Sequence, residues 1–157
     1  MGHGAQKLFG VLGGHGIQGT GGFMETLGLR PGRIHATLAG SAEFFGGLLL
    51  ALGLFVPFAA AVLIATMVTA SLTAHRGKGI WAQDGGLELP LVYSTIAFGL
   101  AAVGAGDWSL DYAFGFDLAG AEWALGALGA GLLGGIGAVV AGRLGHESGS
   151  PAHPQGA

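Results

Sequence analysis

The sequence predicts an all-α membrane protein, a polytopic bundle with four transmembrane helices, and two observations carry this prediction. The first is composition: of 157 residues, 51% are hydrophobic and 10% are charged, whereas soluble domains carry about 25% charged residues. The second is that 34 glycines are interleaved with leucine, alanine, valine and phenylalanine. Membrane helices tolerate this mixture because small residues let two backbones approach closely. We therefore expect the lipid bilayer to surround most of the chain.

Four segments have the apolar character needed to cross a bilayer, which takes about 20 residues, or fewer in a tight bundle. They are residues 36–55, 57–74, 89–104 and 121–142. The first two must be antiparallel neighbours because only a tight turn separates them. Pro57 suits the first turn of the helix that follows this turn.

The remaining segments are expected to lie outside the membrane core. Residues 1–34 are predicted to form a cytoplasmic or interfacial glycine-rich segment, with a loop at 13–22 and one helical turn at 23–28. Residues 35–120 hold the bundle core. After the additional helix at 121–142, residues 143–157 are predicted to form a disordered tail.

The charges flanking the four spans alternate in sign along the chain. The cations outside the spans are Lys7, Arg30, Arg33, Arg76, Lys78 and Arg143. The charged residues between the third and fourth spans are all acidic, namely Asp107, Asp111 and Asp117. The positive-inside rule then predicts that both termini and the loop 76–88 are cytoplasmic.

Small residues recur every fourth position on three spans and predict the faces where helices touch. On the last span the ridge is Gly126, Ala130, Gly134, Ala138 and Gly142, with Leu125, Leu128, Leu132, Ile136 and Val139 expected away from it. The rows on the first two spans are Ala39, Glu43, Gly47, Ala51 and Ala61, Ala65, Thr69, Thr73. Such faces are also suited to contact between copies of the chain.

Glu43 is the candidate of greatest interest, because it lies about seven residues inside its span. A carboxylate at that depth costs several kcal/mol if it is ionised and unpaired, so we expect it to be protonated or paired. It shares a row with small residues and should face the bundle interior. Two interpretations stay open: a proton-carrying or ligand-binding group, and a structural hydrogen bond to a neighbouring helix.

Further polar candidates lie near helix ends. His3, Gln6 and Lys7 fall on one helical face, either as a ligand-binding cluster or as a solvated helix end. His75 follows the second span, where a cation would also complement the helix C-terminus. Glu88 precedes Pro90 at a helix start, where the dipole alone would favour an acid. For both, a ligand role and a structural role stay open.

Several classes of function find no support in the residues. The net charge of −3 provides no basic patch for nucleic acid. Without cysteine the chain has neither disulfides nor thiol redox chemistry of its own. No set of His, Asp and Glu has metal-ligand spacing. Residues 14–19 (GHGIQG) match the dinucleotide fingerprint in letters, but no strand precedes them, so they are interpreted as a loop.

Several short motifs follow one another along the chain: HGAQKLFG at 3–10, GGHG at 13–16, GFMETLGL at 22–29, AEF at 42–44 with GGLLL at 46–50, and GGLELP at 85–90. Together they resemble the DoxX family of small bacterial membrane proteins. The resemblance runs from His3 to about Tyr112. It implies a multi-pass protein of the bacterial plasma membrane with a four-helix bundle, in which Glu43, His75 and Glu88 occupy polar positions typical of the family.

The resemblance also shapes the expected function. It implies a membrane subunit or accessory of a redox system, quinone-linked or related to oxidative stress, with soluble or membrane redox proteins as partners and no reaction assigned to the chain itself. We expect Glu43, His3, Gln6 and Lys7 to hold a quinone or small acidic ligand. The alternative is a non-catalytic scaffold that gathers soluble partners through its cytoplasmic loops.

The chain departs from the family pattern at both ends. Met1 stands almost at the motif that normally ends the first hydrophobic helix, so either the true start lies upstream of Met1 or most of that helix is missing. The span at 121–142 is an additional C-terminal helix. Its small-residue ridge led us to expect that it packs where the missing helix would lie.

Overall fold

A computed structural model describes residues 1–147, with only the backbone described for residues 146 and 147, and this part of the chain is helical without strands. The elements are α1 (Gly2–Phe9), α2 (Gly16–Thr26), α3 (Gly32–Leu52), α4 (Val56–Leu72), the 3-10 turn η1 (Ala82–Asp84), α5 (Glu88–Val103), α6 (Leu110–Phe114) and α7 (Ala121–Glu147). The all-α class is confirmed. The predicted tail at 148–157 lies outside the described residues.

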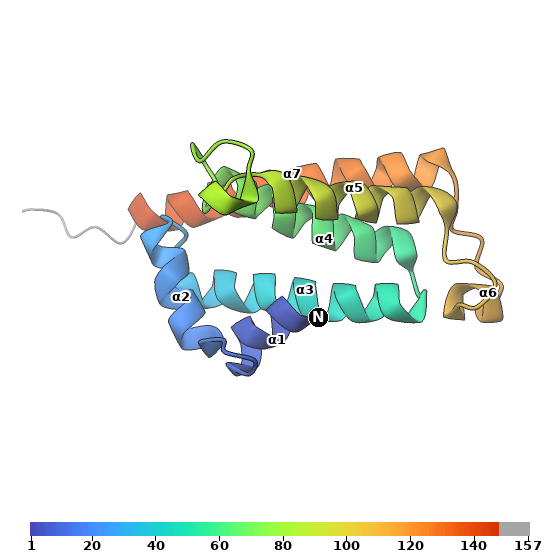
Figure 1. Cartoon of the computed structure of the whole chain (residues 1–157), viewed down its shortest axis with the longest axis horizontal. Coiled ribbons are helices and arrows are strands. Elements are labelled where there is room, and N and C mark those ends of the chain that lie inside the picture. The colour runs from blue at the N-terminus through green and yellow to red at the C-terminus, as the bar shows by residue number, and fades with distance from the viewer. Residues whose placement is uncertain (148–157) are drawn as a thin grey trace, which may run out of the picture.

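The helices form two layers, which Figure 1 shows one above the other. In one layer α1 and α2 pack against α3, and in the other α4 packs against α5 and α7. The two layers are joined where α3 turns directly into α4. Because α7 packs mainly on α4 and α5, whereas α1 packs on α3, α7 does not lie beside the N-terminal helix, and the expectation that it replaces a first helix is not supported.

The four apolar segments appear as α3, α4, α5 and α7. In the described part of the chain, Gly32–Leu52 and Ala121–Gly145 are long and apolar enough to cross a membrane by length and composition, while Val56–Leu72 and Glu88–Val103 are apolar but shorter. The last helix runs to Glu147, five residues beyond its expected end at 142. Residues 143–147 therefore extend the helix and do not begin the tail.

The glycine-rich segment at 13–22 was expected to be a loop, and this is wrong from Gly16 onward because α2 begins there. The glycines serve close packing between α2 and the start of α3. At Gly21 a Cβ atom would lie only 3.1 Å from the backbone nitrogen of Arg33. Glu25, also on α2, accepts a hydrogen bond from the Gly32 N–H at 3.1 Å and so caps the first turn of α3.

The face by which α7 contacts α4 differs from the predicted ridge by one residue. Gly126, Ala130 and Gly134 are exposed, whereas the neighbouring row Ala127, Gly131, Gly135 and Val139 is buried. Of the predicted ridge, Gly142 is buried and Ala138 is half-buried. At Gly135 a Cβ atom would lie 2.6 Å from the Ala65 carbonyl oxygen on α4. A helix with this many glycines carries two rows of small residues, and spacing alone does not choose between them. Val139, expected to face outward, is in the core.

One hydroxyl of the row Ala61, Ala65, Thr69 and Thr73 on α4 bonds to the neighbouring helix. Thr69 donates to the Gly135 carbonyl on α7 at 3.2 Å as well as to Ala65 within its own helix at 2.9 Å. This bond across the interface becomes possible because Gly135 lets the two backbones approach. The α4–α7 pair is thus held by close backbone packing and one hydroxyl.

An acid that the sequence placed in an outer loop holds the α3–α4 turn. Asp111 is buried, and its two carboxylate oxygens accept from the N–H groups of Phe55 and Val56 at 2.8 and 3.3 Å. These donors open α4, where the helix dipole favours a negative charge. The backbone N–H of Asp111 in turn donates to Gly53 at 2.9 Å. Asp111 therefore fixes the end of the bundle at which the layers meet.

Candidate functional site

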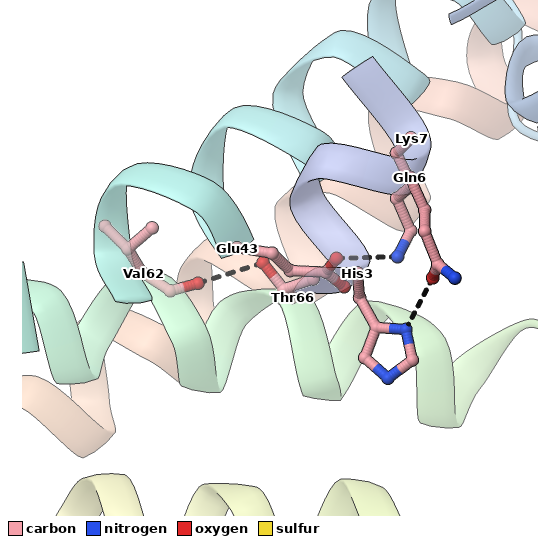
Figure 2. Close-up of polar contacts among 6 residues, drawn as sticks. All are labelled: His3, Gln6, Lys7, Glu43, Val62 and Thr66. Carbon is pink, nitrogen blue, oxygen red and sulfur yellow. Dashed lines mark hydrogen bonds and ion pairs between the residues drawn. The ribbon is translucent and has the colours of Figure 1, made fainter. Parts of the chain in front are cut away.

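Glu43 lies in the middle of α3 with 9% of its surface exposed, as expected for an inward-facing carboxylate. Its Oε2 atom accepts a hydrogen bond from the Lys7 Nζ atom on α1 at 2.6 Å, and the two groups form an ion pair (Figure 2). The expectation that Glu43 is protonated or paired is met by pairing. Between side chains of residues 1–145 the structure contains no other ion pair.

Lys7 reaches Glu43 because α1 packs on α3 through glycine on both sides. At Gly40 a Cβ atom would lie 2.8 Å from Cγ of Leu8, and at Gly4 it would lie 2.6 Å from the Gly40 carbonyl oxygen. The two backbones therefore run close together at this crossing. Phe9 of α1 also packs edge-to-face on Phe44 of α3, with ring centroids 5.6 Å apart.

His3 is held in one orientation by a short chain of hydrogen bonds. The Gln6 Nε2 atom donates to the Leu12 carbonyl at 2.8 Å, which leaves the Oε1 atom of Gln6 facing the Nδ1 atom of His3 at 3.0 Å (Figure 2). An amide oxygen only accepts, so the Nδ1 atom carries the hydrogen. In neutral His3 the Nε2 atom is then a free acceptor. Gln6 therefore positions His3, while Lys7 bonds to Glu43 instead.

Two cavities lie between the layers, of about 460 and 530 Å³, and His3 and Glu43 line both. Met67 of α4 and Tyr93 of α5 also line both cavities, from the opposite layer. Most of the remaining lining is apolar. Pockets of this size with an apolar wall and a few convergent polar groups are typical of small-molecule sites.

The first cavity joins the polar cluster to an apolar chamber. Besides the shared residues, it is lined by Met1, Gly2, Gln6, Leu12, Gly47, Leu50, Leu63, Ile96 and Ala97. Its polar side chains are His3, Gln6 and Glu43 from α1 and α3 and Tyr93 from the opposite layer, and the rest of the wall is apolar. The chamber thus offers an apolar body a place next to hydrogen-bonding groups.

The second cavity extends along α4 and carries more polar groups. Lys7, His35, Thr66, Thr73 and His75 line it, together with Glu43. The Thr66 hydroxyl donates to the Val62 carbonyl at 3.0 Å, which leaves its oxygen able to accept (Figure 2). His75, which follows the end of α4, lines the same cavity as Lys7 and Glu43.

His75 and Glu88 also have structural partners. The Nδ1 atom of His75 bonds to the Gly85 carbonyl at 2.6 Å, and the Glu88 carboxylate accepts from the Ala82 N–H at 2.8 Å. Both bonds shape the loop between α4 and α5. Glu88 lines neither of the two cavities between the layers, so the structure places it apart from the other candidates.

Sequence reasoning missed three residues of the cavity walls, Met67, Tyr93 and His35. The first two belong to apolar helices whose orientation a pattern of periodicity could not fix. The polar handle of Tyr93 in an apolar segment was the signal that could have marked it, because a tyrosine hydroxyl in such surroundings usually meets a partner or a ligand.

An all-helical chain whose long apolar helices enclose a carboxylate–ammonium pair defines a small helical membrane protein. Residues 1–76 match the model of the DoxX family, which supports membership of that family for this part of the chain. The match ends before Tyr112, where the resemblance was expected to end, and covers α1 to α4. It includes His3, Gln6, Lys7, Glu43 and His75. No curated protein and no solved structure matches the chain.

Proposed function

We propose that this chain is a multi-pass protein of the plasma membrane that serves a redox system as a ligand-binding subunit, with a quinone as the ligand. The Lys7–Glu43 pair supports this proposal, because Glu43 lines both cavities and Lys7 lines the second. A redox partner takes up the electrons, since the chain has no cysteine of its own. The chain contributes binding and proton exchange.

The chemistry of a quinone fits the distribution of polar groups. A quinone ring has two carbonyl oxygens, which need hydrogen-bond donors, on an apolar body with an isoprenoid tail. The Lys7 ammonium supplies donors beside Glu43. The apolar chamber lined by Leu50, Leu63 and Ile96 suits the ring or the start of the tail.

Oxidation of a quinol to a quinone releases two electrons, which pass to the redox partner, and two protons, which two groups of the site can accept. Neutral His3 presents its Nε2 atom as an acceptor because Gln6 holds the other ring nitrogen. Glu43 exchanges its bond to Lys7 for a bond to a ligand hydroxyl. In this proposal His3 and Glu43 exchange protons, Lys7 binds an oxygen, and Gln6 positions His3.

The membrane arrangement belongs to the same proposal. We place α3, α4, α5 and α7 across the bilayer, with the loop 76–87 in the cytoplasm and Asp107 and Asp117 outside. The chain has no cysteine, so single cysteines introduced at the exposed positions Gln83 and Asp117 test this in intact cells. An impermeant maleimide should label Asp117→Cys and spare Gln83→Cys.

The ligand is tested with the purified protein and a short-chain ubiquinone analogue. We expect the analogue to raise the melting temperature, because a ligand that binds the folded state adds a stabilisation set by its concentration over Kd. Glu43→Gln should reduce this rise, while Asp107→Asn, at an exposed site far from the cavities, should leave it unchanged. Equal rises in the native protein and in Glu43→Gln would overturn the assignment of the site.

A further inference from the structure

The loop between α4 and α5, residues 76–87, presents two large apolar side chains on its outer surface. Ile80 and Trp81 are 59% and 64% exposed. The loop joins the ends of two apolar helices, and Leu72 and Leu89 on either side of it are exposed as well. Contiguous exposed apolar groups mark sites of contact with a membrane or a partner protein.

Backbone hydrogen bonds hold this loop in a defined shape. The Trp81 carbonyl accepts from the Gly86 N–H at 2.9 Å, and the Ile80 carbonyl accepts from the Glu88 N–H at 2.8 Å. At Gly86 a Cβ atom would lie 2.6 Å from the Gly79 carbonyl oxygen, so the loop closes only with glycine there. The second bond ties Ile80 to the first residue of α5.

Two side chains add to this framework from outside the loop's own backbone. Glu88 accepts from the Ala82 N–H at 2.8 Å, and His75 bonds to the Gly85 carbonyl at 2.6 Å. The exposure of Ile80 and Trp81 is therefore built into the fold, since their backbone atoms are fixed on both sides. A loop without these bonds would be free to fold its apolar side chains inward.

Cations accompany the apolar pair on the same loop. Arg76 and Lys78 are exposed, and neither pairs with a carboxylate among the side chains of residues 1–145. Figure 1 places the loop at the same end of the molecule as the α2–α3 corner and the end of α7. Five of the six Lys and Arg residues belong to these segments: Arg30, Arg33, Arg76, Lys78 and Arg143.

Four acids lie at this end as well, Glu25, Asp84, Glu88 and Glu147, so the five cations exceed them by one. Glu25 and Glu88 accept backbone N–H groups, and Asp84 is the exposed acid of the loop. The opposite end, around α6, carries Asp107 and Asp117 and no Lys or Arg. The molecule is therefore polarised, and its positive end coincides with the exposed Ile80 and Trp81.

We infer that this end binds anionic phospholipid, with the loop 76–87 seated in the headgroup layer. Ile80 and Trp81 enter the boundary between headgroups and acyl chains, where amphipathic aromatic rings are favoured. Arg76 and Lys78 contact the lipid phosphates, since polybasic segments at the membrane surface attract anionic lipids. A bilayer fits better than a soluble partner, because the apolar patch continues into the exposed Leu72 and Leu89 of the helices. This inference does not depend on the quinone proposal.

Trp81 itself provides the measurement. In the variant W108F/W123F, which replaces two exposed tryptophans, Trp81 is the only tryptophan of the chain. The full-length protein is placed in phosphatidylcholine bilayers containing a minor fraction of brominated lipid. Quenching of Trp81 by brominated phosphatidylglycerol is compared with quenching by brominated phosphatidylcholine at equal fraction.

We expect stronger quenching by the anionic lipid and a smaller difference in high salt. In R76Q/K78Q the preference for phosphatidylglycerol should fall, by about fivefold in local enrichment for each cation removed. Quenching by phosphatidylcholine should persist there, and Gln83→Ala, an exposed neutral position on the same loop, should retain the preference.

Two results would overturn the inference. Equal quenching by both lipids in the native loop would exclude an anionic lipid site. Absence of quenching by either lipid would place Trp81 in water and leave the loop to a soluble partner. Because the circular dichroism of R76Q/K78Q reports its folding separately, a collapsed variant is recognised, and Arg76→Lys should then retain the preference if charge decides it.

Discussion

The ammonium of Lys7 lies 2.6 Å from Oε2 of Glu43, so the short α1 helix and the long α3 helix are joined by a charge pair inside the bundle. The side chains are 25% and 11% exposed; Glu43 lines both cavities and Lys7 lines the second. An ionised group at this depth is tolerated when it is paired, and a missing partner leaves the other charge uncompensated.

The pair should therefore behave as a unit in a double-mutant cycle. We expect Lys7→Gln and Glu43→Gln each to lower the free energy of unfolding by about 2 kcal/mol, less than for a fully buried pair because Lys7 is partly exposed. The double variant should lose less than the sum of the two. Denaturant unfolding of the three variants in one detergent measures this, and strict additivity would mean that the two groups do not interact.

The tautomer of His3 should depend on Gln6. In the native protein at alkaline pH, where imidazoles are neutral, the Nδ1 atom of His3 should be protonated, because it donates to the Gln6 amide oxygen. In Gln6→Leu this preference should be lost. Nitrogen-15 NMR of labelled histidines detects the change, with His3→Gln assigning the signal and Gln83→Leu as the control. An unchanged His3 spectrum in Gln6→Leu would remove Gln6 from its positioning role.

Asp111 should be the most important acid for stability outside the cavities. Asp111→Ala leaves the N–H groups of Phe55 and Val56 without their acceptors at the start of α4. We expect a loss of about 2–3 kcal/mol, the combined cost of a lost helix cap and an unpaired buried donor. Asp107→Ala, an exposed acid four residues earlier, should change stability by less than about 0.5 kcal/mol. Equal losses in both variants would contradict a stabilising role for the hydrogen bonds that Asp111 accepts from Phe55 and Val56.

A methyl group should distinguish the two glycine rows of α7. Gly135→Ala forces α7 away from the Ala65 carbonyl of α4 and should cost about 1–3 kcal/mol. Gly126→Ala meets no atom within 4 Å and should be neutral or stabilising, because alanine favours the helix. Thermal unfolding of both variants in the same detergent decides, and a greater loss in Gly126→Ala would favour the predicted ridge over the observed face.

Composition and local spacing predict those features of the fold that do not depend on contacts between distant residues. Composition and apolar length predicted the helices α3, α4, α5 and α7 and the inward position of Glu43. The partner of Glu43 was not predictable, because Lys7 lies 36 residues away and reaches it only through the Gly4–Gly40 crossing. That contact is a property of packing, which periodicity does not reveal.

The errors have a common physical origin in glycine. Glycine marks loops in soluble proteins, so residues 16–22 were interpreted as a loop, although here glycine lets α2 pack against α3. On α7, two rows of small residues made the predicted face wrong by one residue. Asp111 was missed because its acceptor role depends on the N–H groups of a turn 55 residues away. In each case the deciding contact joins segments far apart in the chain.

The central claim is that a quinone occupies the cavities beside His3 and Glu43, and photolabelling with a photoreactive quinone analogue tests it most directly. Mass spectrometry of the purified protein should map the label to residues that line both cavities, such as Met67 or Tyr93, with excess unmodified quinone protecting them. Glu43→Gln should reduce this protected labelling. Labelling confined to outward residues such as Leu125 and Leu133, unaffected by excess quinone, would contradict the account.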